Sequence, residues 1–368
     1  MKTTEIIIVG GGLAGLTAAR ELATSGREVV VFEKQKLPHH KVCGEYLSRE
    51  VVPYLAQIGV PLEDAPSIDR LVLSSPGGRS LTCQLPLGGI GISRFALDYR
   101  LFQAAQKAGV SFVWEAVDSV VHKESGFRVI TRGGEWQAEQ VLGNWGKRSV
   151  LDRVQNRSFF TKSSPWLGIK MHYRATYPSD QVGLYGFKGG YGGLSVTESG
   201  AVNFCYLIHK NRFKETPDLE GCTKGLLREH PALHEVLDAA EPLFDKPLGI
   251  SNIYFGHKGL SANRVLMSGD AAGLIHPLCG NGMAMAIQGG RLQAEVLQEY
   301  LNGDLADREL LEANYSNAWQ KEFRTRLWIG ERLQNVLVSP SGLNLGIRLG
   351  ARVPFLPRAV IRKTHGTL

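Results

Sequence analysis

The sequence has few of the features that mark secreted, metal-binding or membrane-spanning proteins. Its 368 residues include only five cysteines, an odd number with no Cys-x-x-Cys spacing and no histidine pattern at metal-ligand spacing. Such a pattern argues against a disulfide framework and a zinc site, and it suits a reducing compartment. No apolar run reaches the roughly 18 residues that a membrane-spanning helix needs. We therefore expect a cytoplasmic protein without a metal site.

Dense runs of one charge are also absent. Lysine and arginine outnumber aspartate and glutamate by 42 to 35, a formal net charge of +7, but they are spread along the chain. This charge predicts a basic surface that attracts anionic cofactors or lipid head groups, and no motif indicates nucleic-acid binding. With 43% hydrophobic residues and no low-complexity tract, the chain is long enough for two or three domains with a large core.

Glycine, in contrast, is abundant, and three glycines near the N-terminus form the most informative motif. Residues 6–9, IIIV, are a continuous apolar run, typical of a strand buried on both faces of a parallel sheet. Gly10, Gly12 and Gly15 follow in the spacing Gly-x-Gly-x-x-Gly. The first glycine of this motif permits a tight turn, the second lets a pyrophosphate approach the backbone, and the third lets a helix pack closely on the strand. A dinucleotide site is the prediction, and a glycine-rich turn that binds nothing is the alternative.

The residues after the turn strengthen this prediction. Residues 13–25 are expected to form a helix, so the N–H groups at its start, near Leu13 and Ala14, face the phosphates. Glu33 directly follows the next predicted strand, residues 29–32. It lies 18 residues after Gly15, close to the roughly 20 expected for an acid that hydrogen-bonds a ribose hydroxyl. Because an acid there repels a 2′-phosphate, the turn is expected to bind FAD or NAD rather than NADP. The motif alone does not distinguish FAD from NAD.

Four stretches occur in an order that resembles the FAD-dependent oxidoreductases. They are GGGLAGLTAARELATSGREVVVFEK, CGEYLS, SRFALDYRLFQAA and VLMSGDAAGLIHPLCGNGMAMAIQGG. The set resembles the geranylgeranyl-reductase-like family, which is related to the aromatic-hydroxylase type of flavoprotein monooxygenase and to the flavin halogenases. Many families share the glycine fingerprint, whereas the CGE and GD…PLCGNG segments are more specific together. The resemblance covers nearly the whole chain.

The resemblance implies an FAD site with NAD(P)H as the reductant. Arg94 matches a flavin-contacting arginine whose guanidinium pairs with phosphate, and a surface salt-bridge arginine is the alternative. Asp270, after Gly269, would accept hydrogen bonds from the ribityl hydroxyls, or cap a helix, or do both. The remaining contacts that the resemblance implies are Gly10, Gly12, Leu13, Ala14, Gly15, Glu33, Lys34, Cys43, Gly44 and Val117.

Two further segments would lie at the flavin ring in this family. Gly280, Asn281, Gly282 and Met283 would place a helix N-terminus against the pyrimidine edge, where reduced flavin carries negative charge. Cys43 and Glu45 would lie near the flavin, so they are the candidate catalytic residues. The alternatives are a small buried residue for Cys43 and a solvent-facing loop acid for Glu45.

One segment departs from the family pattern. Aromatic hydroxylases and many reductases carry an Asp-Gly pair after the meander, but the segment VLGNWGKRSVLD has Trp145 in place of the aspartate. This replacement puts in doubt the family's usual contacts with the pyrophosphate and the nicotinamide donor. We expect Trp145 either to stack on a cofactor ring or, more simply, to pack in the core.

The fold class that follows is α/β with an α+β second domain. A Rossmann-like FAD-binding domain with a parallel sheet and a β-meander is expected at residues 1–70, 94–160 and 261–305. An antiparallel β-sheet substrate domain is expected at 71–93 and 161–260, and a C-terminal helical region at 306–368. Two local expectations are that Ser48 caps a helix running to about residue 58, and that residues 248–257 form a strand.

The function implied is an FAD-dependent oxidoreductase, reduced by NAD(P)H, that acts on a small apolar, isoprenoid- or polyketide-like substrate. It would reduce or form a C=C bond by hydride transfer through flavin N5. The alternative is a flavin-dependent monooxygenase that hydroxylates or epoxidises; lesser ones are a prenyl-group-binding protein of the same fold and a plain NAD dehydrogenase. The apolar and cationic tail, residues 343–358, is expected to rest on an anionic membrane or to pack on its own domain.

Overall fold

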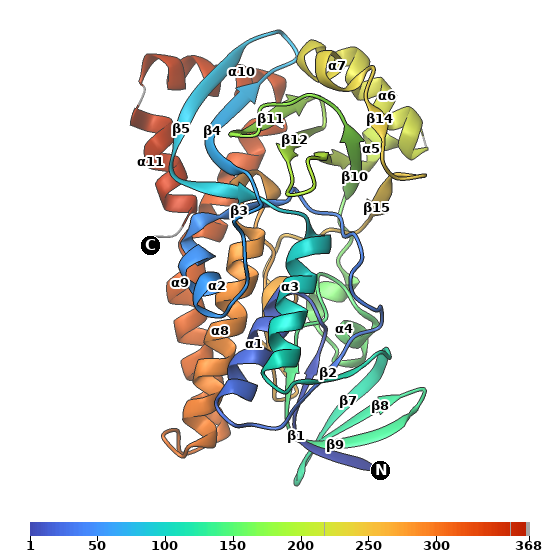
Figure 1. Cartoon of the computed structure of the whole chain (residues 1–368), viewed down its shortest axis with the longest axis vertical. Coiled ribbons are helices and arrows are strands. Elements are labelled where there is room, and N and C mark those ends of the chain that lie inside the picture. The colour runs from blue at the N-terminus through green and yellow to red at the C-terminus, as the bar shows by residue number, and fades with distance from the viewer. Residues whose placement is uncertain (217, 354, 366–368) are drawn as a thin grey trace.

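The computed structural model describes residues 1–216, 218–353 and 355–365. Two β-sheets lie one above the other, and a column of long helices runs along one side of both (Figure 1). The N-terminus lies beside the lower sheet, and the C-terminal helices lie beside the upper one. The expected C-terminal region, 306–368, therefore extends past the described residues at its end and contains one further gap at 354.

The first sheet has eight strands with a parallel core, in the main order β16–β17–β9–β1–β2–β6. Its strands are β1 (Lys2–Val9), β2 (Val29–Phe32), β6 (Ser111–Val113), β7 (Val117–Lys123), β8 (Gly126–Thr131), β9 (Gly134–Gly143), β16 (Ser261–Ala262) and β17 (Val265–Met267). β1 pairs in parallel with β2 and β9. β7, β8 and β9 form the expected meander. The apolar run at the end of β1 is almost completely buried, as its composition predicted.

Helices cover this sheet and extend toward the second one. They are α1 (Leu13–Thr24), α3 (Arg94–Lys107), α4 (Val150–Val154), α8 (Gly282–Leu301) and α9 (Arg308–Leu337). Small residues let α8 approach α1 closely, since a Cβ atom on Gly290 would lie only 2.2 Å from the carbonyl oxygen of Ala14. A Cβ atom on Gly269 would lie 3.0 Å from the Cβ atom of Ala14. Residues about 260 positions further along the chain, in α8 and just before it, thus pack directly on the start of α1.

The second sheet has nine strands, in the main order β14–β10–β13–β12–β11–β4–β5–β3. Its strands are β3 (Tyr46–Ser48), β4 (Ser67–Ser74), β5 (Ser80–Gly91), β10 (Trp166–Arg174), β11 (Gln181–Phe187), β12 (Gly190–Val196), β13 (Val202–His209), β14 (Glu241–Pro242) and β15 (Leu248–Ile250). Alternation along β10 gives the sheet two different faces. Ile169, Met171 and Tyr173 pack against a cluster from α6 and α7, whereas Lys170 and His172 point to the other side.

The remaining described helices have between 4 and 13 residues. They are α2 (Val52–Gln57), α5 (Lys210–Phe213), α6 (Leu219–Glu229), α7 (Pro231–Leu237), α10 (Pro340–Arg352) and α11 (Phe355–Thr364). α10 packs tightly on the second sheet, since a Cβ atom on Gly186 would lie 2.3 Å from Leu343. A Cβ atom on Gly350 would lie 2.5 Å from Leu81. Among the described helices, none has the length and apolar character to cross a bilayer.

Three details differ from the sequence-based expectations. The second sheet begins before residue 71, because β3 pairs with β5 and β4 starts at Ser67. Ser48 ends β3 and stands at the N-cap of a 3₁₀ turn, Arg49–Val51, that runs directly into α2, but its side chain makes no capping hydrogen bond and its hydroxyl is buried without a partner in the described structure. Residues 248–257 are strand only over β15, which pairs with β10 as far as Ile250; the chain then leaves the ladder, and Ile253 packs over Gly168.

Candidate cofactor and substrate site

The glycine turn between β1 and α1 has one open side. Gly10 has φ +112°, and a Cβ atom there would lie 2.2 Å from the carbonyl oxygen of Asn144. A Cβ atom on Gly15 would lie 1.9 Å from the carbonyl oxygen of Gly10. At Gly12 the nearest atom is Nη2 of Arg94, 3.9 Å away. No side chain caps α1 and no acid lies in its first turn, so the open side suits an anionic group such as a pyrophosphate.

Glu33 lies at the edge of this turn, directly after β2. Its Oε2 atom accepts a hydrogen bond of 2.8 Å from the N–H of Gly11, and Oε1 accepts one of 3.1 Å from Gln35. The carboxylate is thereby fixed beside the turn and keeps acceptor capacity for ribose hydroxyls. Lys34 follows on the exposed side, and Val117 starts β7 as a half-buried residue packed on the first core.

Arg94 is the first residue of α3, after the N-cap Ser93. Its Nε and Nη2 atoms donate to the two oxygens of Asp98 at 2.7 and 2.9 Å, and Lys41 Nζ lies 2.7 Å from the same carboxylate. Asp98 is fully buried, which by itself raises its pKa, but Arg94 and Lys41 outweigh this and hold the pKa below its ordinary value. Two cations thus share one anion, leaving positive charge beside the turn. Arg94 thus forms a salt bridge, as the alternative expected, but its partner Asp98 is fully buried and Arg94 itself is half-buried rather than on the open surface.

Gly269 and Asp270 lie between α1 and α8. They belong to a short 3₁₀ turn, Gly269–Ala271, whose N-cap is Ser268. Asp270 therefore caps no helix. A small cavity at this point is lined by Asp270, Gly282 and Met285, among others. Lys258 Nζ donates to the carbonyl oxygen of Asp270 at 2.7 Å and holds this turn in place.

The start of α8 also lies at this cavity. Asn281 is its N-cap, but the side chain does not cap the helix and donates instead to the carbonyl oxygen of Thr364 in α11, at 2.8 Å. Gly280 has φ +63°, in the left-handed region. Met283 belongs to one buried cluster with Leu13 of α1. The segment 280–283 and the start of α1 therefore pack in the same region.

Trp145 packs in the core beside the glycine turn. Its ring approaches Gly143, and its Nε1 atom donates to Asp152 at 2.9 Å. Arg157 binds the same carboxylate at 2.8 Å. The indole is therefore anchored within the protein, which favours packing over stacking on a cofactor.

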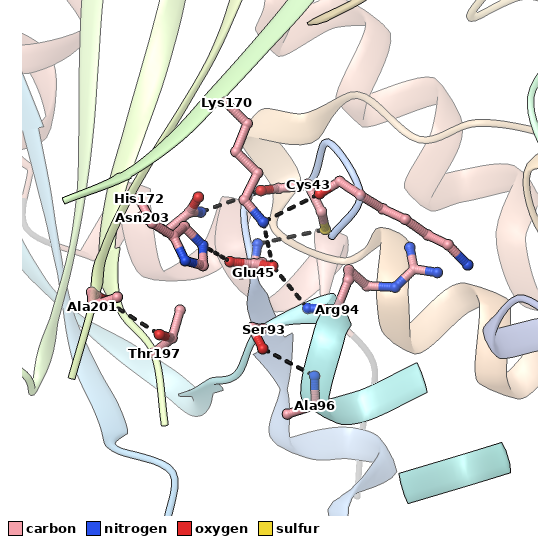
Figure 2. A network of polar contacts seen from close by, with 12 residues as sticks. Cys43, Glu45, Ser93, Arg94, Ala96, Lys170, His172, Thr197, Ala201 and Asn203 are labelled. Carbon is pink, nitrogen blue, oxygen red and sulfur yellow. Dashed lines mark hydrogen bonds and ion pairs between the residues drawn. The ribbon is translucent and has the colours of Figure 1, made fainter. Parts of the chain in front are cut away.

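Loop 41–45 is held by three neighbouring strands of the second sheet (Figure 2). Lys170 on β10 donates to the carbonyl oxygen of Lys41, and Asn203 on β13 donates to that of Cys43, both at 3.2 Å. Ser195 on β12 donates to the carbonyl oxygen of Gly44, also at 3.2 Å. Sequence reasoning did not identify Lys170, Ser195 and Asn203 as part of the site. The one available signal was that polar side chains alternate with apolar ones along β10.

Glu45 is the centre of this network (Figure 2). Its Oε1 atom lies 2.5 Å from Lys170 Nζ and accepts from the N–H of Arg94 at 2.8 Å, while Oε2 lies 2.7 Å from Nε2 of His172. Burial by itself raises the pKa of Glu45, but the hydrogen bond from His172 and the charge of Lys170 outweigh it and hold the pKa below its ordinary value. The residue is fully buried, with φ +55°. The solvent-facing alternative for Glu45 is therefore wrong.

His40 completes a cluster with Glu45 and His172. Ligand-type atoms of the three side chains lie within 4.8 Å of one another, a spacing that a metal ion could bridge. However, the ammonium of Lys170 already occupies the same carboxylate. Because Lys170 is a cation, the cluster disfavours a metal ion electrostatically.

Cys43 lies on loop 41–45, and Cys205 lies on β13 as the register partner of Lys170. Both are half-buried. Burial raises the pKa of both thiols, that of Cys205 to about 12, so both are neutral at neutral pH. Gly44 between Cys43 and Glu45 is exposed, and a Cβ atom there would meet nothing within 4 Å. The loop is therefore held by the sheet on one side and open to solvent at Gly44.

These features define the class of protein. One region, here called the cofactor cradle, is surrounded by the glycine turn at Gly10–Gly15, the acid Glu33 and the uncapped start of α8. It lies beside a second sheet. This arrangement suits FAD. Residues 8–68 match the model of the NAD(P)-binding Rossmann-like domain. The solved structure of a geranylgeranyl bacteriochlorophyll reductase-like protein from Thermoplasma acidophilum matches with a TM-score of 0.82 at 20% identity, covering 99% of this chain and 97% of that one. The chain has the fold of FAD-dependent oxidoreductases, and the expected fold class is confirmed.

Other matches identify more specific relatives. A flavin-dependent brominase matches with a TM-score of 0.81 at 16% identity, covering 99% of this chain and 93% of that one. The menaquinone reductase of Mycobacterium tuberculosis H37Rv is 26% identical over 325 residues, 80% of this chain and 76% of the relative. The digeranylgeranylglycerophospholipid reductase of Thermoplasma acidophilum is 25% identical over 341 residues, 83% of this chain and 80% of the relative. The resemblance to geranylgeranyl-reductase-like flavoproteins is thereby confirmed.

Proposed function

We propose that this protein reduces a C=C bond in a small apolar substrate of isoprenoid or polyketide type. Bound FAD would take a hydride from NAD(P)H and deliver it from N5 to the substrate. The observation that carries the proposal is that the glycine turn and loop 41–45 meet at Arg94: its Nη2 atom lies 3.9 Å from a Cβ atom built on Gly12, and its backbone N–H donates to Glu45. Relatives named as reductases of menaquinone and of a digeranylgeranyl lipid support the substrate class.

Several residues would hold the cofactor. The start of α1 and the guanidinium of Arg94 would bind the pyrophosphate, and Glu33 the ribose. Asp270 would accept from the ribityl hydroxyls, and the start of α8 would stabilise the negative charge of the reduced ring. The full proposed set is Gly10, Gly12, Leu13, Ala14, Gly15, Glu33, Lys34, Cys43, Gly44, Arg94, Val117, Gly269, Asp270, Gly280, Asn281, Gly282 and Met283.

Cys43 and Glu45 would act at the reacting end of the site. The neutral thiol of Cys43 would line the space in which the substrate meets the cofactor. The carboxylate of Glu45, which remains ionised, would orient the loop and the cations around it rather than donate its own proton. The protein would therefore contribute orientation and a low-dielectric site.

We also propose that the C-terminal helices touch an anionic membrane surface. Two expectations concern the tail, packing on its own domain and contact with a membrane, and different faces of α10 suit each of them. Leu343 and Ile347 are buried against the second sheet, whereas Leu345 and Leu349 are exposed. Phe355 and Leu356 at the start of α11 are also exposed. Arg348, Arg352 and Arg358 are exposed cations on the same helices, and this combination suits lipid head groups. Pro354 lies outside the described residues.

The test is an anaerobic two-step reaction of the purified protein. The released cofactor should have the mass of FAD, and NADH or NADPH should bleach its visible absorption. Geranylgeranyl diphosphate or menaquinone should then restore the absorption and gain two hydrogens. If none of these probes reacts without air, but oxygen produces a hydroxylated or epoxidised product, the monooxygenase alternative replaces the proposal.

A further inference from the structure

Lys170 and His172 are buried, ionisable side chains on one face of β10, and both bind the carboxylate of Glu45. Burying such groups costs free energy unless they are paired or serve a function. A simple clamp on loop 41–45 would need only neutral donors, and Asn203 and Ser195 already supply two. The charged pair on β10 therefore calls for a chemical explanation.

The ammonium of Lys170 has a donor to spare. It carries three N–H donors, and within the described structure two acceptors receive them, Glu45 Oε1 and the carbonyl oxygen of Lys41. In the β10–β13 ladder Lys170 is the register partner of half-buried Cys205, so both lie on the face of the sheet that meets loop 41–45. The third N–H donor of Lys170 is thus available to a molecule bound against this face of the sheet.

A polar route leads from Lys170 toward the surface. The two oxygens of Glu45 join Lys170 to His172. A ring nitrogen of half-buried His40 lies within 4.8 Å of both the His172 ring and the Glu45 carboxylate, a gap that one water molecule spans. His40 Nδ1 and Asn203 Oδ1 are buried and lack partners within the described residues, so both can hold such a water.

We propose that Lys170 protonates the substrate, and that Glu45, His172 and His40 return a proton to it from solvent. The inference rests on the proposed function. One alkene carbon receives a hydride, with its electron pair, from the reduced cofactor, and the other receives H⁺ from the Lys170 ammonium. The resulting amine takes a proton from His172 through Glu45, and water restores His172 by way of His40. The product carries two new C–H bonds, and the charges balance.

The surrounding charges are compatible with this route. Arg94, Lys41 and Asp98 face it from α3 and loop 41–45, and His39 precedes His40. The thiols of Cys43 and Cys205 stay neutral, because burial raises their pKa. Burial, together with the charges of Lys170 and His172, lowers the pKa of His40 to about 4. A neutral His40 can accept a proton on one nitrogen and release one from the other.

The test uses the holoenzyme and the variants Lys170→Arg, Lys170→Ala and His172→Gln. Arginine can keep the ion pair with Glu45 but does not give up its proton. Reduction by NADPH is expected to be unchanged, whereas anaerobic reoxidation by geranylgeranyl diphosphate or menaquinone should slow by about 100-fold in Lys170→Arg. Ethylamine should partly restore this step in Lys170→Ala. Glu50→Gln, which alters a different buried ion pair, with Arg326, is the control and should reoxidise as the wild type does.

A readout without turnover is the ¹⁵N-histidine NMR spectrum of the oxidised holoenzyme. On acidification the signals of His172 and His40 should move together, and in Glu45→Gln they should move independently. Wild-type reoxidation in Lys170→Arg, or independent movement in the wild type, overturns the route while leaving the proposed function intact. Failure of the wild-type holoenzyme to reduce either probe overturns the proposed function and this inference together.

Discussion

The ammonium of Lys170 and the carboxylate of Glu45 lie 2.5 Å apart, although 125 residues separate them in the sequence. Both side chains are fully buried. The contact joins the loop after the first sheet's second strand to the inner face of the second sheet (Figure 2). It thus ties the proposed cofactor cradle to the wall of the proposed substrate site.

This pair predicts a large and partly recoverable loss of stability. Lys170→Met should lower the free energy of unfolding by about 3–5 kcal/mol, because it leaves a buried carboxylate with one cation fewer. The double variant Lys170→Met/Glu45→Gln should recover part of the loss. Urea denaturation measures both, and equal losses in the single and double variants would contradict the pairing.

Stability should also depend on pH through Glu45. The pKa of Glu45 is lower in the folded protein than its ordinary value of 4.5. Its stabilising contribution is therefore fully present above about pH 4.5 and is lost as the pH falls toward the folded-state pKa. Denaturation curves taken from pH 6 down to about pH 3 should show a smaller acid-side loss in Glu45→Gln than in the wild type. An identical slope in both proteins would show that Glu45 is not ionised in the native state.

The glycine turn yields a prediction that separates folding from cofactor binding. Gly10→Ala should destabilise the protein by about 2–4 kcal/mol, because the new Cβ atom collides with the backbone at Asn144 and φ is +112°. Gly12→Ala meets open space instead, so stability should change by less than about 1 kcal/mol. FAD affinity should nevertheless fall, since the methyl group fills the side that the pyrophosphate approaches. Titration with FAD and thermal denaturation measure the two effects; unchanged affinity in Gly12→Ala would place the pyrophosphate elsewhere.

The sequence predicted the elements that local patterns determine, and it missed contacts that depend on sheet register. The turn at Gly10, the strand ending before Glu33 and the start of α8 each follow from glycine spacing, apolar periodicity or the family resemblance. Lys170 and His172 could not be assigned to the site, because no local pattern tells which face of β10 meets loop 41–45. The buried state of Glu45 was unpredictable for the same reason, since its partners lie far along the chain.

Trp145 offers a test of packing against stacking. Trp145→Phe keeps an aromatic ring but removes the donor to buried Asp152, so stability should fall by about 1–3 kcal/mol. Flavin fluorescence and FAD affinity should stay the same, because the indole is anchored to the protein. A large rise in flavin fluorescence on substitution would instead indicate that the indole stacks on the cofactor.

Membrane contact through the C-terminal helices is tested with vesicles of defined charge. The double variant Leu345→Ser/Leu349→Ser removes two exposed apolar side chains of α10, and it should weaken binding to anionic vesicles by at least about tenfold. Arg348→Gln/Arg352→Gln should weaken it further at low salt and less at high salt, since salt screens charge attraction. The matched control is Leu310→Ser, an exposed leucine on α9, which should co-sediment as the wild type does. Equal binding of all variants would show that the exposed face of α10 does not meet lipid, and that this helix serves only to cover the second sheet.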